Sequence, residues 1–134
     1  MKDRFARSVF LWAGVVGIAE LLPLYVGEAL VSRVSPPALT HPTFYYGFIG
    51  VALAWQVAFV IMSRDPQRYL PLFPALFLEK LLYPVSTYLL FAHGRVSVLE
   101  LGGASGDLIW LALFVAVWRR LAKRAVATSV TVAV

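Results

Sequence analysis

Four apolar stretches, separated by short links, dominate this chain of 134 residues. They cover approximately residues 8–31, 42–62, 70–92 and 98–118. A helix of about 20 apolar residues is long enough to cross the hydrocarbon layer of a bilayer. Because backbone polar groups in lipid must be paired within the protein, each stretch predicts a membrane-spanning α-helix. We therefore expect an all-α integral membrane protein, with residues 1–134 forming a single transmembrane domain.

Composition agrees with this expectation. Hydrophobic residues make up 60% of the chain and charged residues only 14%, which is too little charge to cover a soluble domain of this size. Cysteine is absent, which excludes a disulfide framework, a thiolate metal site and a cysteine nucleophile. The net charge of +5 lies mainly at the ends of the apolar stretches. That pattern is typical of membrane orientation, so we expect membrane lipids and no nucleic acid as partners.

The three links between the stretches are short, which favours an up-down-up-down four-helix bundle. The first link contains Ser35, Pro36 and Pro37, which cannot continue a helix. The second covers residues 63–68 and the third residues 93–95. The apolar tail that follows Lys123 is too short to cross again, and we expect it to be frayed or to lie against a neighbour.

The basic residues predict the orientation. Only Arg33 and Arg95 belong to the first and third links. Four crossings place the other nine basic residues outside the stretches on one face, which the positive-inside rule makes cytoplasmic. Both termini are then cytoplasmic. The nine are Lys2, Arg4, Arg7, Arg64, Arg68, Arg119, Arg120, Lys123 and Arg124.

Polar side chains inside the apolar stretches are the candidate functional residues. An ionisable group costs about 2.5–3.5 kcal/mol at mid-bilayer on insertion scales, so these groups should face the bundle interior, a watery cavity or each other. A rise of 1.5 Å per residue puts Glu20, Glu79 and Asp107 near the midplane. The candidates for a ligand-binding site or a proton relay are Glu20, Gln56, Glu79, Lys80, Tyr83 and Asp107.

Two interpretations of these residues stay open. In the structural one, Lys80 neutralises Glu20, Glu79 or Asp107, and the network only fixes how the helices align. In the functional one, the same groups form a proton relay or bind a ligand, as intramembrane ionisable residues commonly do.

Prolines and small residues suggest where the helices bend and touch. Pro23 and Pro84 each remove a backbone donor, and a kink there could open a small polar cavity, although membrane helices commonly tolerate proline. Gly102 and Gly106 form a small-xxx-small pattern, as do Ala13 and Gly17. These pairs predict packing surfaces, within the chain or with another subunit.

Metal and motif signals are weak. His41 and His93 lie at the expected outer ends of helices, where free histidines are common, and their spacing does not require a metal or a haem. We therefore predict no metal site. A phosphate loop, a Ser-His-Asp order and a zinc motif are all missing from the sequence, which leaves open whether the protein is an enzyme.

In its layout the whole chain resembles the bacterial DoxX-like class of small four-helix membrane proteins. The features that carry the resemblance are the span arrangement, Glu20 in the first stretch, the Arg64-Asp65-Pro66 turn and the Glu79-Lys80 pair. DoxX-type proteins are associated with quinone-linked sulfur oxidation or redox homeostasis. The resemblance implies a bacterial cytoplasmic (inner) membrane protein, raises a quinone as a possible ligand, and supplies no catalytic residue.

Three functional hypotheses follow. The first is a polar intramembrane site that binds a quinone or another lipid-soluble molecule in a redox context. The second is an accessory subunit that packs on a larger membrane complex, or on another copy of itself, through its small-residue faces. The third is a proton- or ion-coupled carrier, which would need an oligomer, because four helices leave little room for alternating access.

Overall fold

The computed structural model describes residues 3–34 and 39–132, with side chains up to residue 125. Within these ranges the chain is helical apart from short links, and it holds no strand. The predicted turn at Ser35, Pro36 and Pro37 lies outside the described residues, as do Lys2 and the last two residues of the tail. The elements, in chain order, are α1 (Arg4–Leu21), the 3-10 helix η1 (Leu22–Tyr25), α2 (Glu28–Val34), α3 (Pro42–Met62), the 3-10 helix η2 (Pro66–Leu72), α4 (Phe73–Ala92) and α5 (Val98–Val132).

Four helical segments among the described residues are long and apolar enough to cross a membrane. This confirms the prediction of an all-α chain with four such stretches. The second segment coincides with the predicted 42–62. The four segments are Arg4–Tyr25, Pro42–Met62, Pro66–Ala92 and Val98–Ala125.

The first segment differs from the predicted 8–31 at both ends. It starts at Arg4, where Asp3 accepts a hydrogen bond from the backbone N–H of Ala6 (3.2 Å) and caps the helix. It ends earlier because Pro23 lies in the first turn of η1, where its missing N–H is tolerated. The chain then turns, and α2 begins as a separate short helix at Glu28. Pro23 thus ends the first α-helix instead of bending it.

The last two segments are longer than predicted. The third, predicted as 70–92, starts at Pro66 because it includes η2, which contains Pro66 and Pro71. The fourth, predicted as 98–118, continues as α5 to Val132, so residues 124–132 are helical and not frayed; whether they lie against a neighbour stays a prediction. No glycine or proline follows Gly106, and alanine and arginine are strong helix formers, so the local sequence contains no stop signal.

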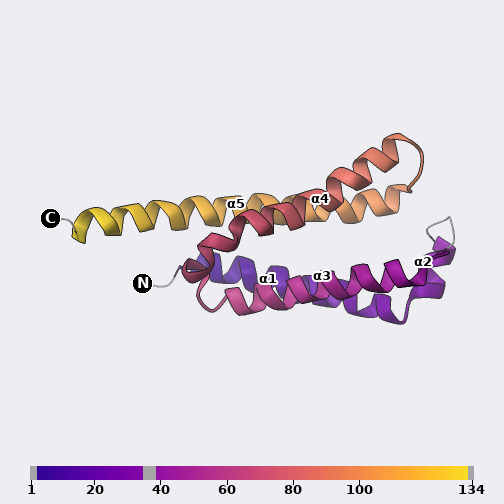
Figure 1. The fold of residues 1–134 in the computed structure, drawn as a ribbon, viewed down its shortest axis with the longest axis horizontal. Helices are drawn as coiled ribbons and strands as arrows, with labels where there is room; N and C mark the ends of the chain where they lie inside the picture. Colours follow the sequence, from indigo (N-terminus) through magenta and orange to yellow (C-terminus); the bar gives the residue numbers. More distant parts are fainter. Residues whose placement is uncertain (1–2, 35–38, 133–134) are drawn as a thin grey trace.

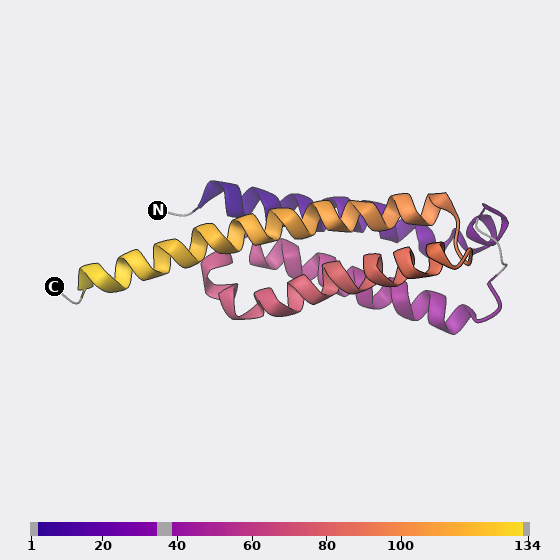
Figure 2. The ribbon, with the colours of Figure 1, turned by 90° about the horizontal axis from the view of Figure 1, so that it is seen from above.

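The helices pair as two hairpins. α1 packs along α3, and α4 packs along α5 (Figure 1 and Figure 2). The start of α1, the η2 link and the far part of α5 lie at one end of the molecule, while α2 and the α4–α5 link lie at the other (Figure 1). Toward that other end the two hairpins diverge (Figure 1).

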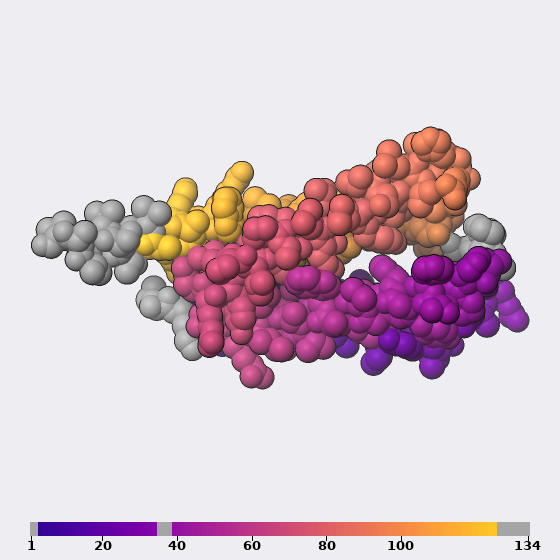
Figure 3. Space-filling view, viewed as in Figure 1, coloured from indigo at the N-terminus to yellow at the C-terminus, as the bar shows by residue number. Residues whose placement is uncertain are grey.

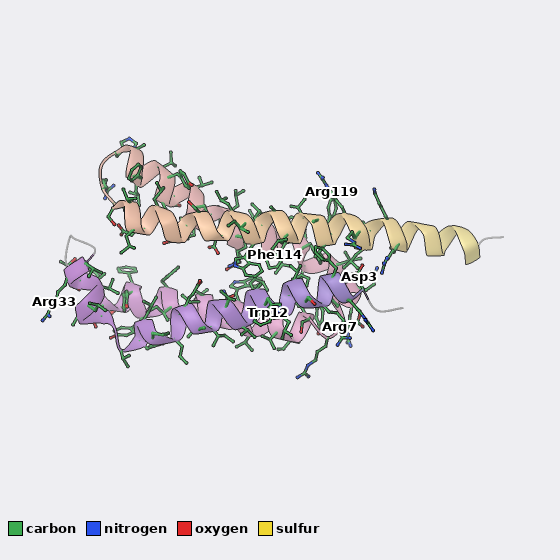
Figure 4. All side chains as sticks on the ribbon, turned by 180° about the vertical axis from the view of Figure 1, so that it is seen from behind. Asp3, Arg7, Trp12, Arg33, Phe114 and Arg119 are labelled. Carbon is green, nitrogen blue, oxygen red and sulfur yellow. The ribbon has the colours of Figure 1, made fainter. Side chains whose placement is uncertain are left out.

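The arginines labelled in Figure 4 are divided between these two ends of the molecule. Asp3, Arg7 and Arg119 lie toward one end of the bundle, and Arg33 lies at the opposite end (Figure 4). Arg124 pairs with Asp3 across 3.1 Å, and the Arg7 side chain donates a hydrogen bond to the Ser63 carbonyl across 3.1 Å. We call the end that holds Asp3, Arg7 and Arg124 the basic end.

Glycine makes the contact between α1 and α3 close. A Cβ atom built at Gly14 would lie 2.6 Å from the Gln56 carbonyl oxygen, and one built at Gly17 would collide with the Gln56 side chain. At Gly14 the backbone of α3 leaves no room for a larger residue, and at Gly17 the buried Gln56 side chain would have to move. The predicted packing role of Gly17 is therefore confirmed.

A cluster of four phenylalanines joins the hairpins near the basic end, one each from α1, α3, α4 and α5. All four are fully buried. The Phe10 and Phe114 rings stack with centroids 4.9 Å apart, and the Phe59 ring meets Phe114 edge-on at 5.1 Å. Such aromatic contacts add to the packing energy of the core. The phenylalanine cluster consists of Phe10, Phe59, Phe73 and Phe114.

Candidate functional site

A cavity of about 700 Å³ lies between the hairpins, next to the phenylalanine cluster on the side away from the basic end. The space-filling surface is hollowed there, between the α4–α5 hairpin and α3 (Figure 3). Its lining comes from α1, η1, α3, α4 and α5. Because the hairpins diverge beyond the phenylalanine cluster, the bundle is closed at one end and hollow in its middle.

All six polar residues singled out in the sequence line this one cavity. They come from four helices: one from α1, one from α3, three from α4 and one from α5. The structure thus brings together residues that lie up to 87 positions apart in the chain. Whether they bind a ligand or relay protons stays a prediction. The six are Glu20, Gln56, Glu79, Lys80, Tyr83 and Asp107.

Lys80 is the centre of a charged cluster. Its ammonium group donates a hydrogen bond to Asp107 Oδ1 at 2.9 Å and lies 3.2 Å from Glu79 Oε1. It also lies 5.4 Å from the centroid of the Phe59 ring. Only 6% of the Lys80 side chain is exposed, so the two carboxylates offset much of the cost of burying the charge. We call Glu79, Lys80 and Asp107 the charged cluster.

Glu20 does not belong to this cluster. It lines the cavity from α1 but is exposed, and among the described residues no hydrogen bond or ion pair to it is found. Of the three partners open to Lys80 from the sequence, the structure selects Glu79 and Asp107. Helix depth alone could not distinguish them, since all three acids lie at a similar level.

One oxygen of the charged cluster is unpaired. Glu79 Oε2 is buried and has no hydrogen-bond partner among the described residues. Buried polar atoms are nearly always hydrogen-bonded, because a lost partner costs about 1–3 kcal/mol or more. Since Glu79 lines the cavity, a bound molecule or a water there could supply the missing donor.

Gln56 and Tyr83 lie on facing hairpins. Gln56 is a buried residue, 3% exposed, and its Nε2 donates to the Ala52 carbonyl at 3.2 Å. The Tyr83 ring of α4 lies 5.8 Å from the Phe48 ring of α3, centroid to centroid. This aromatic pair connects the two hairpins beside the cavity.

The sequence interpretation missed part of the lining. Phe48, Trp55 and Trp110 also face the cavity, yet in the sequence they are ordinary aromatic residues of apolar stretches. The small-residue pattern of Gly102 and Gly106 in α5 was visible in the sequence, but it predicted a packing surface and not a cavity wall. A Cβ at Gly102 or Gly106 would meet no atom within 4 Å, so these positions border the cavity and make no close helix contact within the chain. A contact with another subunit stays a prediction.

Proline and histidine complete the comparison with the sequence. Pro84 is buried inside α4, one turn after Lys80, and removes the donor that would bond the Lys80 carbonyl. His41 Nδ1 lies 2.9 Å from Thr40 Oγ1, and His93 Nδ1 lies 2.7 Å from the Leu89 carbonyl. In residues 3–34 and 39–132 we find no group of three or more histidines and acids that could hold a metal ion.

Comparison of the chain with protein-family models, with curated proteins and with solved structures finds no match. The resemblance to the DoxX-like class therefore rests on the sequence layout alone and stays an expectation.

Proposed function

We propose that this chain is an integral membrane protein that binds a lipid-soluble molecule in the cavity between its two hairpins. The observation that carries the proposal is the convergence of six polar residues, from four apolar helices, on one cavity of about 700 Å³. Ligand pockets in proteins commonly measure about 300–1,000 Å³ and combine an apolar lining with a few polar groups. Keeping ionisable groups in an apolar bundle is costly, which supports a function for them.

The proposed topology places the four helices up-down-up-down across a bacterial cytoplasmic membrane. The basic end would face the cytoplasm, as the positive-inside rule expects. The charged cluster would then lie inside the hydrocarbon layer, and the cavity would be reached from the lipid or from the external side. A quinone is one lipid-soluble molecule of suitable size, and the DoxX-like resemblance is the support for a redox setting.

A pair of glycine variants tests the binding proposal. A Cβ atom at Gly106 would meet no atom within 4 Å and the position lines the cavity, so the fold should tolerate Gly106→Leu while the leucine side chain fills space that the ligand needs. Gly47→Leu is the matched control, because that position is equally free of neighbours and lies outside the cavity. Each protein would be purified in mild detergent, and the bound lipids would be extracted and identified by mass spectrometry.

The expected result is a stoichiometric small molecule on the wild type and on Gly47→Leu that is lost from Gly106→Leu. Equal recovery from all three proteins would overturn the cavity as the binding site. A partner protein in stoichiometric amounts, with no small molecule on the wild type, would instead favour the accessory-subunit hypothesis.

A further inference from the structure

The charges of the cavity are unbalanced. Its described lining residues include three acids, Glu20, Glu79 and Asp107, against the single amine of Lys80. That amine is already engaged by two carboxylates at 2.9 Å and 3.2 Å. A ligand that brings a negative charge would have to displace one of these carboxylates. A ligand that brings a positive charge would meet Glu20, which has no cation, and two carboxylates that share a single cation.

The cavity-lining groups that have no partner are carboxylate oxygens, which accept hydrogen bonds and attract cations. Glu79 Oε2 is buried without a partner in the described part of the chain, and it belongs to α4. Glu20 lines the cavity from α1, on the other hairpin. A neutral quinone carries no positive charge, so it would leave the excess of carboxylates in the cavity uncompensated, whereas a cation would offset it.

Aromatic side chains supply a second, independent feature. Phe48 and Trp55 line the cavity from α3, Tyr83 from α4 and Trp110 from α5. Aromatic faces attract organic cations through the ring quadrupole, and a set of such rings is the usual way in which proteins hold a quaternary ammonium group. The attraction is strongest where water is excluded. Lys80, which lies over the Phe59 ring in this bundle, uses the same interaction.

We propose that the cavity selects a lipid-soluble organic cation, whose positive group is held by the Glu79 carboxylate and the surrounding aromatic rings. This rests on the proposed function and names the class of ligand. The apolar part of the molecule occupies the space along Ala52, Leu78 and the glycines of α5. The positive charge of the ligand offsets the excess of carboxylates that Lys80 alone does not neutralise.

Binding of matched hydrophobic ions tests the proposal. The wild-type protein would be placed in nanodiscs of zwitterionic phosphatidylcholine, and tryptophan fluorescence would be recorded because Trp55 and Trp110 line the cavity. The probes are tetraphenylphosphonium, tetraphenylborate and triphenylphosphine oxide, which are similar apolar molecules with positive, negative and zero charge. Empty nanodiscs and a tryptophan-containing control peptide correct for partition into the lipid.

We expect saturable quenching by the cation, with an affinity at least about tenfold above that for the neutral probe, since the attraction between a cation and a mostly buried carboxylate is worth this much or more. Glu79→Gln should lower the affinity for the cation about tenfold or more. Glu28→Gln is the control, because Glu28 lies on α2, accepts a hydrogen bond from Tyr46 and does not line the cavity. If Glu79→Gln does not fold, Tyr83→Leu replaces it, because Tyr83 is one of the aromatic rings that the proposal assigns to the cation and its loss leaves both tryptophans in place.

The outcomes separate this inference from the proposed function. Equal affinities for the cation and the neutral probe overturn the inference, while the cavity stays a binding site. The inference also fails if tetraphenylborate binds as tightly as tetraphenylphosphonium, or if Glu28→Gln weakens the cation as much as Glu79→Gln does. If no probe quenches the wild type and no small molecule co-purifies with it, the proposed function falls as well.

Discussion

At the scale of single residues, Lys80 is held by two acids and not by the third. Asp107 and Glu79 contact its ammonium group, while Glu20 lines the same cavity without pairing. The sequence predicted the need for a partner from the cost of a buried charge. It could not name the partner, because depth along a helix does not fix the direction in which a side chain points.

Lys80→Met should lower the free energy of unfolding by about 3 kcal/mol, because it leaves two mostly buried carboxylates without their cation. Asp107→Asn added to it should recover part of the loss. Glu20→Gln added to it should recover nothing. Thermal unfolding in detergent would measure all three proteins, and recovery by Glu20→Gln alone would show that Glu20 is the true partner.

Gly17→Leu should destabilise the α1–α3 contact, because its Cβ alone already collides with the Gln56 side chain. We expect a loss of roughly 1–3 kcal/mol, the usual cost of overpacking. Gly47→Leu, where a Cβ meets nothing, is the control and should keep wild-type stability. Equal melting temperatures of the two variants would contradict the close packing of α1 on α3.

At the scale of helices, the sequence predicted the number of apolar helices better than the residues at which they begin and end. The 42–62 stretch begins at a proline and ends before a polar link, so both of its limits were visible. The limits of the others depended on backbone geometry. Pro23 started a new 3-10 turn, and α5 continued because nothing in its sequence stopped it. Hydropathy indicates which residues can contact lipid, and a helix can extend beyond those residues at either end.

The phenylalanine cluster packs the two hairpins against each other in the buried core, so Phe114→Ala should weaken their association. Phe114 contacts Phe10 at 4.9 Å and Phe59 at 5.1 Å. In a bilayer the separated helices are already in an apolar medium, so mainly packing energy is lost. We expect about 2 kcal/mol, below the roughly 3–5 kcal/mol of aqueous cores. Phe44→Ala is the control, since Phe44 is 77% exposed, and denaturant unfolding would compare the two.

At the scale of the whole molecule, the cavity could be predicted only in part. The sequence placed six polar residues at compatible depths, and all six line one space. It did not reveal the aromatic share of the lining. It also interpreted Gly102 and Gly106 as a contact surface, because a small-residue pattern looks the same whether it meets a helix or borders a hollow.

Reporter fusions test the proposed topology. A reporter inserted at Gln67, or fused after the last residue, should give a cytoplasmic signal. One inserted beside Gly94, in the α4–α5 link at the opposite end, should give an external signal. A shared signal for the insertions at Gln67 and Gly94 would exclude four crossings in this order.

The pairing of helices that are neighbours in the chain has a consequence for assembly. Each hairpin makes its closest contacts within one half of the sequence, and contacts of low sequence separation form early and fast. Each half should therefore insert and pair by itself, and the halves should dock afterwards through the phenylalanine cluster. Residues 1–65 and 66–134, expressed as separate polypeptides, should co-purify as a complex. In such a complex the cavity would arise only at the last step, when two finished halves meet.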